Sequence, residues 1–268
     1  MTRPAQDPIW QRIRKEVEAD IACEPMLASF LYSVVLNHER FEDALGFLLA
    51  NKLESPTLTA PTLRDLFDHA LGMDKTVGVY AREDIEAVCT RDPACRGCSV
   101  PLLYFKGFHA IQSYRIAHYF WEHGRYALAR YLQSRISEVF SVDIHPAAQL
   151  GCGLLFDHAT SIVIGETAVV EDNVSMLHEV TLGGTGKETG DRHPKVRRGV
   201  LIGAGVKILG NVEIGEGAKI GAGSVVLDPI PPHCTAVGVP AKVVGRPRTE
   251  LPAFDMDHRV SGGNDDRC

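Results

Sequence analysis

The sequence contains no long apolar run, and this excludes whole classes of protein. Its most apolar helical stretch, SFLYSVVL at residues 29–36, is far too short to cross a bilayer. The first twenty residues are charged and lack the apolar core of a signal peptide. We therefore expect a soluble, cytoplasmic protein.

The cysteines are not arranged as a disulfide framework. They are odd in number and irregularly spaced, at positions 23, 89, 95, 98, 152, 234 and 268. Cys95 and Cys98 form a single C-x-x-C, but a zinc site needs two further ligands at matching spacing, and none is evident. We interpret this pair as part of a surface loop and expect no metal site in the protein.

Basic residues are not gathered into one block either. The 268 residues carry a formal charge of −6 and are 45% hydrophobic and 23% charged, which is ordinary for a globular protein. This balance argues against nucleic acid as the main partner. A small anionic ligand is still compatible with it, because local charge decides such binding. The length allows one large core or two modest ones.

The first half of the chain is predicted to be helical. Apolar residues recur every four positions near its start, at Ile9, Ile13, Val17 and Ile21. The segment 61–71 begins with a helix-start signal, and residues 108–140 read as two helices separated by Gly124. We expect seven or eight helices before residue 140. Since none carries a catalytic motif, we assign them to packing, scaffolding or oligomerisation.

The second half has a period of six. Apolar residues occupy every sixth position in two series, Ile144, Leu150, Phe156, Ile162, Ala168, Val174, Val180 and then Val196, Ile202, Ile208, Ile214, Ile220, Val226. This period is neither helical nor the alternation of a simple strand, and it is typical of a β-helix built from hexapeptide repeats. Three repeats make one triangular coil, so residues eighteen apart should stack. Glycine permits the tight corners.

The period is interrupted between Val180 and Val196, which are sixteen residues apart instead of eighteen. The intervening segment, GGTGKETGDRHPK at 183–195, is too polar and glycine-rich to form a coil face. We predict that it bulges outward as a loop. Loops on rigid scaffolds often carry function, and this one contains Arg192 and His193.

Ionisable residues lie near this interruption. Asp157 and His158 follow Phe156 and can point outward while Phe156 fills the core. Asp143 lies just before the first coil. An aspartate that accepts a hydrogen bond from a neutral imidazole fixes its tautomer and raises its basicity, so the pair would be a general base with its orienting group.

The loop adds positive charge to this set. Arg192 and His193 suit a carboxylate or a developing oxyanion, and Glu166 is expected to point outward or to be paired. Each residue also has a plainer interpretation, as a surface pair, a solvated cation or a corner cap. A further functional alternative is a metal site of His158, His178 and His193, as in β-helical carbonic anhydrases.

The segment 142–215 resembles the serine acetyltransferases, the enzymes of cysteine biosynthesis that form O-acetylserine. The resemblance is carried by DHATSIVIGETA (157–168), GGTGK (183–187) and GDRHPK (190–195), a combination that generic sugar acetyltransferases do not share. GVPAKVVG (238–245) is similar to the closing segment of hexapeptide acyltransferases. RDPA (91–94) and the segment 101–120 resemble the helical domain of this family.

The resemblance implies an α+β fold. An all-helical oligomerisation domain at residues 1–140 would precede a left-handed parallel β-helix of hexapeptide repeats at 141–245, the catalytic domain. Residues 246–268 would form a flexible C-terminal tail. The family pattern also implies trimers that pack into a hexamer through the helical domains.

The resemblance further implies direct acetyl transfer from acetyl-CoA to L-serine, with acetyl-CoA as co-substrate and no permanently bound cofactor. His158 would be the catalytic base and Asp143 its orienting group. Five residues would bind serine: Asp92 and Asp157 at the ammonium group, and Arg192, His193 and Glu166 at or behind the carboxylate. The acetyl-CoA groove would use Gly184, Ala204, Lys219 and Ala222.

A route through an acyl-cysteine is not expected, because Cys152 and His158 are six residues apart and would lie on different coil faces. L-cysteine is the expected feedback inhibitor, since it would occupy the serine site. Family members often end in an isoleucine that inserts into cysteine synthase, whereas this chain ends SGGNDDRC. Cysteine synthase is therefore a partner that the resemblance suggests and the tail argues against.

Overall fold

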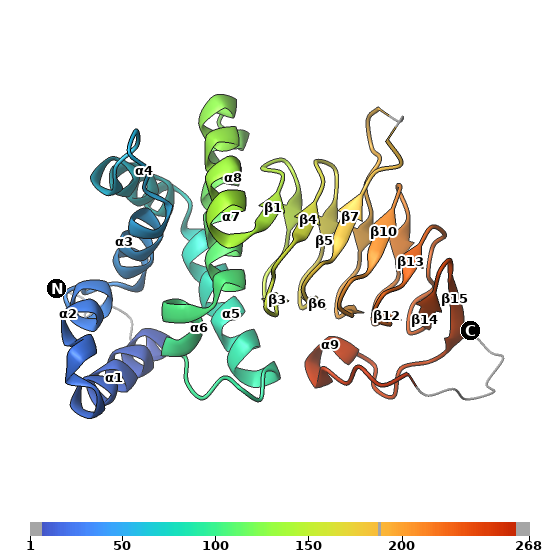
Figure 1. The fold of residues 1–268 in the computed structure, drawn as a ribbon, viewed down its shortest axis with the longest axis horizontal. Helices are drawn as coiled ribbons and strands as arrows, with labels where there is room; N and C mark the ends of the chain where they lie inside the picture. The colour runs from blue at the N-terminus through green and yellow to red at the C-terminus, as the bar shows by residue number, and fades with distance from the viewer. Residues whose placement is uncertain (1–6, 187–188, 261–268) are drawn as a thin grey trace.

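The computed structural model describes residues 7–186 and 189–260, and it consists of a helical region followed by a β-helix (Figure 1). The α-helices of the first region are α1 (Pro8–Cys23), α2 (Ala28–Leu31), α3 (Phe41–Leu53), α4 (Ala60–Met73), α5 (Lys75–Arg91), α6 (Ser99–Tyr104), α7 (Lys106–Glu122) and α8 (Tyr126–Phe140). A 3-10 turn, η1 (Pro25–Leu27), and a π-helical turn, η2 (Tyr32–Leu36), flank α2. The predicted helical half is confirmed, and Gly124 separates α7 from α8 as expected.

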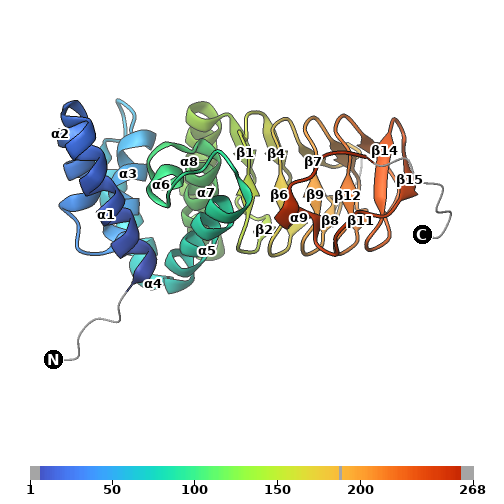
Figure 2. The same ribbon diagram turned by 90° about the horizontal axis from the view of Figure 1, so that it is seen from below.

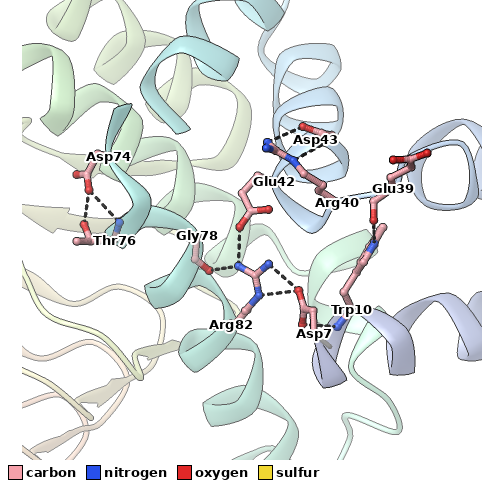
Figure 3. A network of polar contacts seen from close by, with 10 residues as sticks. All are labelled: Asp7, Trp10, Glu39, Arg40, Glu42, Asp43, Asp74, Thr76, Gly78 and Arg82. Carbon is pink, nitrogen blue, oxygen red and sulfur yellow. Dashed lines mark hydrogen bonds and ion pairs between the residues drawn. The ribbon is translucent and has the colours of Figure 1, made fainter. Parts of the chain in front are cut away.

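An arginine holds the outer helices together (Figure 3). The guanidinium of Arg82, on α5, donates to Asp7 at 2.6 and 2.9 Å, to Glu42 at 2.8 Å and to the carbonyl of Gly78 at 2.6 Å. Asp7 caps α1 by accepting a hydrogen bond from the amide of Trp10. The network therefore ties α5 to the starts of α1 and α3.

The β-helix has three flat faces of short strands. The first face consists of β1 (Val142–Ile144), β4 (Ile162–Ile164), β7 (Thr181–Gly183), β10 (Lys207–Leu209) and β13 (Val225–Val226). The second consists of β2 (Gln149–Leu150), β5 (Val169–Val170), β8 (Lys195–Val196) and β11 (Glu213–Ile214). The third consists of β3 (Leu155–Phe156), β6 (Ser175–Met176), β9 (Leu201–Ile202), β12 (Lys219–Ile220), β14 (Thr235–Gly238) and β15 (Ala241–Gly245).

The pairing register shows two insertions in the repeat, where the sequence indicated a single interruption. Ile144 stacks on Ile164 and Phe156 on Met176, so the first coil has a step of twenty residues. The extra residues lie in the turn 157–161, between β3 and β4. Val170 stacks on Val196, a step of twenty-six that contains the predicted loop. Steps of eighteen occur from Ile164 to Leu182, before the loop, and in the coils after it.

Because of the first insertion, four residues of the predicted series do not occupy the stacking positions. Ile162, Ala168, Val174 and Val180 are buried, but each lies two residues before the residue that continues the stack from Ile144, Leu150 and Phe156, and Ile162 pairs with Val142 instead. A search for apolar residues at every sixth position does not reveal this two-residue shift, because the predicted positions and the stacking positions are both apolar. The β-helix itself and its outward loop after β7 are confirmed.

Two of the three corners matter for the site. We call the turns 157–161, 177–180, 203–206 and 221–224, which lead from the third face to the first, the histidine corner. We call the turns 145–148 and 165–168, together with residues 184–186 and 189–194 of the loop, the loop corner; these segments lead from the first face to the second. The two corners lie at opposite edges of the first face.

Both ends of the β-helix are covered. Helices α7 and α8 pack on β1 at one end, and at the other end β15 pairs antiparallel with β14 (Figure 1). Buried polar contacts join the helices to the first coils. Asp84, fully buried on α5, accepts hydrogen bonds from Arg115 at 2.8 Å, Gln112 at 2.7 Å and the amide of Leu154 at 2.8 Å. These buried hydrogen bonds therefore fix the helical region relative to the first coils of the β-helix.

Residues 246–260, expected to be part of a flexible tail, fold back along the coils (Figure 2). A short helix, α9 (Pro252–Asp255), contacts α5 and β9, and the carbonyl of Ala253 accepts a hydrogen bond from Ser175 Oγ at 2.9 Å. The ring of Phe254 lies 4.3 Å from the guanidinium of Arg91. Composition does not reveal these contacts, because they join a backbone carbonyl and one aromatic ring to residues far away in the sequence. The last eight residues of the tail lie outside the described residues, and so does its terminal cysteine.

Within the part of the chain that the structure describes, no helix has the length and apolar character needed to cross a membrane.

Candidate active site

The turn that carries Asp157 and His158 has an unusual backbone. His158, Ala159 and Ser161 have φ angles of 56°, 58° and 62°, in the left-handed region that side chains disfavour. Such conformations cost about 1–3 kcal/mol each and persist only where the surroundings impose them. Here the amide of Ser161 donates to the carbonyl of Ser141 at 2.7 Å. The inserted residues thus form a strained turn at the first coil of the histidine corner.

Helix α7 presses against this strained turn. A Cβ atom on Gly107 would lie 2.1 Å from the carbonyl oxygen of Phe156, closer than real contacts allow. Lys106, at the start of α7, donates a hydrogen bond from Nζ to Thr160 Oγ1. Glycine at position 107 therefore allows the helix to support the turn directly, a role that the sequence reading did not anticipate.

A cavity of about 390 Å³ opens at this turn. It is lined by Asp92, Ala94, Tyr104, Phe105, Lys106, Gly107, Phe156, Asp157 and His158. The imidazole of His158 is 75% exposed, and its Nε2 lies 3.9 Å from Asp157 Oδ1. Three predicted residues, Asp92, Asp157 and His158, therefore surround one space that suits a small ligand with a cationic group and a reactive hydroxyl.

Asp92 reaches this cavity because its neighbour anchors the end of α5. Arg91 is 5% exposed, and its guanidinium donates to the carbonyl of Gly153 at 2.9 Å, to Ser175 Oγ at 3.2 Å and to Asn173 Oδ1 at 2.9 Å. Burial lowers the pKa of Arg91 to about 10. The guanidinium is still charged near neutral pH and binds the helix end to two coils.

The loop corner holds a second group of predicted residues. Arg192 Nη2 lies 2.6 Å from Glu166 Oε2, and the hydroxyl of Thr167 accepts hydrogen bonds from the amides of Arg192 and His193 at 3.0 and 3.1 Å. His193 Nδ1 lies 2.9 Å from Thr167 Oγ1 and accepts from the amide of Thr167 at 3.2 Å. This pattern assigns the ring proton of neutral His193 to Nε2.

Electrostatics keep this second group in a defined charge state. The hydrogen bond from Arg192 lowers the pKa of Glu166, so the carboxylate stays ionised. Burial, and then the charge of Arg192, lower the pKa of His193 and favour its neutral form. The corner therefore offers one guanidinium and one neutral N–H donor, an arrangement suited to a carboxylate.

His145 joins this group although the sequence reading did not select it. It is half-buried at the first turn of the loop corner, its ring centroid lies 5.0 Å from that of Trp121, and it interacts electrostatically with Glu166 and Arg192. Burial lowers its pKa. His145 lies two residues after Asp143 and one coil before Gly165. This spacing is the sequence signal that could have identified it.

The chain brings the predicted residues together in two groups at different corners. Among the described residues, no hydrogen bond or ion pair joins Asp143 to His158; Asp143 instead accepts from Gln133 Nε2 at 2.7 Å. Arg192 likewise lies at the other corner from His158. The predicted base and orienting pair is thus not formed within one chain.

The residues expected to bind acetyl-CoA are divided in the same way. Ala204 and Ala222 follow His158 along the histidine corner, and Gly184 lies at the base of the loop beside His193. Lys219 lies on the third face, where Nζ donates to the carbonyl of Arg259 at 2.7 Å beneath the tail. Burial lowers the pKa of this lysine.

The alternative metal site is not assembled either. The rings of His158 and His178 are neighbours, with centroids 6.0 Å apart, but His193 lies at the loop corner. Throughout residues 7–186 and 189–260, no group of three histidine, cysteine or acidic residues has the geometry to hold a metal ion.

Known proteins share both the sequence and the fold. Residues 9–113 match the family described as serine acetyltransferase, N-terminal, and residues 193–228 match the bacterial transferase hexapeptide (six repeats) family. A serine acetyltransferase of Salmonella typhimurium is 57% identical over 254 residues, which cover 95% of this chain and 93% of that protein.

Solved structures of relatives include ligand complexes. A serine acetyltransferase in complex with cysteine has a TM-score of 0.93 and 56% identity, over 94% of this chain and 98% of that one. The Brucella abortus enzyme in complex with coenzyme A has a TM-score of 0.89 and 54% identity, over 90% and 96%. The Neisseria gonorrhoeae enzyme in complex with serine has a TM-score of 0.86 and 54% identity, over 88% and 98%. By sequence and by fold, the chain belongs to the serine acetyltransferase family.

Proposed function

We propose that the protein transfers the acetyl group of acetyl-CoA to the hydroxyl of L-serine, giving O-acetyl-L-serine and CoA, the first step of cysteine biosynthesis from serine. Family membership and the relatives solved with serine and with coenzyme A support this function. The observation that carries it is the cavity in which an exposed imidazole lies beside Asp92 and Asp157.

The complete site is shared between neighbouring copies of the chain. The two groups of residues lie at opposite edges of the first face, so no single chain brings them together. The histidine corner of one copy packed against the loop corner of the next would join both groups, and a closed ring of three copies would form three such sites. We further propose that two of these trimers form a hexamer through the helical regions.

In this arrangement His158 acts as the general base. It removes the proton of the serine hydroxyl while that oxygen attacks the thioester carbon of acetyl-CoA. The tetrahedral intermediate collapses by breaking the C–S bond, and the protonated imidazole returns its proton to the leaving thiolate. Asp143, contributed across the interface, would orient the imidazole and stabilise its charged form.

Recognition of serine uses both corners. Asp92 and Asp157 hold the ammonium group, while Arg192 and the Nε2–H of His193 bind the carboxylate. Glu166 keeps Arg192 in position through their 2.6 Å contact. The backbone at Ala204, Ala222 and Gly184 lines the path of the pantetheine arm, and Lys219 lies near the far end of the cofactor.

L-cysteine, bound by a solved relative, would compete for the serine site and inhibit the enzyme. Cysteine synthase is the partner protein that the family resemblance suggests, and co-migration of the two proteins on a sizing column tests it. A cytoplasmic location fits an enzyme that uses acetyl-CoA.

A thiol-release assay tests the reaction. CoA release should require L-serine and fall when cysteine is added, and a response to homoserine or a galactoside alone would contradict the assignment. A mixing experiment tests the shared site. H158A and R192A, each weakly active alone, should regain part of the activity when unfolded and refolded together, because some sites then hold both intact residues. If the mixture recovers no activity, the proposal that each site combines residues of two chains is wrong.

A further inference from the structure

Three cysteines cluster where α5 gives way to α6. The Sγ atoms of Cys89 and Cys98 are 3.3 Å apart, and Cys95 Sγ lies 3.9 Å from that of Cys89. Cys98 is 4% exposed, whereas Cys89 and Cys95 are half-buried. The C-x-x-C motif of the sequence therefore gains a third thiol from the last turns of α5. The proposed reaction does not use these thiols, and among the described residues they belong to no metal site.

The cluster surrounds a residue of the proposed serine site. Asp92 is the C-cap of α5, between Cys89 and Cys98, and its Oδ1 accepts a hydrogen bond from the amide of Ala94 at 2.8 Å. The amide of Cys95 donates to the carbonyl of Asp92 at 3.0 Å. A covalent bond between Cys89 and Cys98 would close a ring around this turn and constrain the carboxylate that lines the cavity.

We propose that this cluster is an oxidisable dithiol site that takes a small-molecule disulfide as oxidant and forms a Cys89–Cys98 disulfide. The Cys89 thiolate attacks one sulfur of the small disulfide, which forms a mixed disulfide and releases one small thiol. Cys98 then attacks the protein sulfur of the mixed disulfide and releases the second small thiol. Two protein thiols are oxidised and one disulfide is reduced to two thiols.

The geometry favours this pair. Cys89 is accessible enough to meet the oxidant, and buried Cys98 is the nearer thiol to complete the reaction. The two sulfurs must approach from 3.3 Å to about 2.0 Å, which requires a small shift of the short turn between α5 and α6. A glutathione-like disulfide or cystine has the required chemistry, and separate incubations with each show which of the two the site accepts.

Several charged groups act on the thiols. Arg12, on α1, carries positive charge near Cys89 and Cys98, while Asp92 opposes ionisation of Cys95. Glu16 accepts a hydrogen bond from the amide of Ser99 at 2.8 Å beside the cluster. Burial raises the pKa of both Cys89 and Cys95. Cys89 and Cys95 are therefore mainly protonated near neutral pH, and oxidation should be slow there and faster in alkaline buffer.

The test uses the full-length protein, incubated at alkaline pH with oxidised glutathione or with cystine, alkylated and digested with trypsin. Cleavage after Arg82, Arg91, Arg96 and Lys106 places the three thiols on separate peptides, residues 83–91, 92–96 and 97–106. We expect 83–91 linked to 97–106, reversibly by dithiothreitol. C98A should abolish this link and C152A should leave it unchanged. Free thiols, a mixed disulfide alone, or a link of 83–91 to 92–96 would overturn the proposal.

The functional effect rests on the proposed role of Asp92 in binding serine. Oxidised wild-type enzyme should show a several-fold higher KM for serine, an unchanged KM for acetyl-CoA, and full recovery with dithiothreitol; oxidant-treated C98A should keep the reduced values. Formation of the disulfide without any change in KM would remove the link to the active site. Reduced enzyme that fails to acetylate serine would instead contradict the proposed function and leave the thiol chemistry standing.

Discussion

The two corners of the β-helix hold their functional residues in different ways. At the histidine corner the strain is in the backbone, and the side chain of His158 is 75% exposed and free to turn toward a ligand. At the loop corner a dense set of hydrogen bonds holds the side chains, and Arg192 and His193 are fixed by Glu166 and Thr167.

This difference matches the two tasks proposed for the corners. A group that exchanges a proton must reach the substrate, so it is exposed and its position is set by the turn beneath it. Groups that bind a carboxylate gain affinity when their side chains are held in place before the ligand arrives. Changes at the histidine corner should therefore alter turnover, whereas changes at the loop corner should alter affinity.

The largest expected effect is loss of the imidazole. H158A should lower kcat by about 10²–10⁴-fold, the usual contribution of a general base. H158N separates chemistry from backbone strain, because asparagine tolerates a positive φ; it should be equally inactive. H233A is a matched control, since His233 also has a positive φ of 54° in a turn away from both corners. CoA release at saturating substrate measures all three, and an active H158N would exclude His158 as the base.

Removing the support beneath the turn should have the next largest effect. In G107A the new methyl group meets the carbonyl of Phe156, so α7 and the turn must move apart. A displacement of about 1 Å can cost 10²-fold in rate, and kcat should fall more than serine affinity. The control is G72A, since a Cβ on Gly72 meets no atom within 4 Å. Wild-type turnover in G107A would show that the turn holds its shape without the helix.

A substitution at the loop corner should change the affinity for serine more than it changes kcat. R192A removes a charged hydrogen-bond donor, worth about 1.5–3 kcal/mol, and should raise the KM for serine about 10–100-fold with a smaller change in kcat. R198A, in a looser and more exposed pair with Glu216 at 3.7 Å, serves as control. Initial rates over a range of serine concentrations give both constants. A fall in kcat alone would remove the distinction between the corners.

The smallest effect concerns pH. Because the pKa of His193 is lower in the folded chain than in the unfolded one, the unfolded state binds more protons just below pH 6.5, and the free energy of unfolding should decrease as pH falls through that value. H193Q should lose part of this dependence. Urea unfolding at pH 7.5 and pH 5.5 measures it, with H233Q as control. An identical slope for wild type and H193Q would contradict the assigned burial effect.

Sequence reasoning identified the two halves of the chain, the loop and the residues of both corners because each leaves a local pattern. It did not identify the two-residue insertion at 157–161, since apolar residues occupy both possible registers there. Gly107 acts through Phe156, far along the chain, so no local spacing marks it. His145 and Cys89 lie close in sequence to Asp143 and to the C-x-x-C motif, but spacing alone does not show that they contact these groups in the fold. The path of residues 246–260 depends in part on hydrogen bonds to the backbone carbonyls of Ala253 and Arg259, which composition does not reveal.

The two ends of the β-helix restrict how copies of the chain can meet. Helices α7 and α8 pack on one end, and at the other end β15 pairs antiparallel with β14. Because the two ends differ, they do not pair with each other to extend a fibre along the axis of the β-helix. In the proposed trimer the copies meet sideways instead, and rotation about an axis parallel to the β-helix closes the ring. Closure of that ring would limit the size of the assembly and give every copy a neighbour.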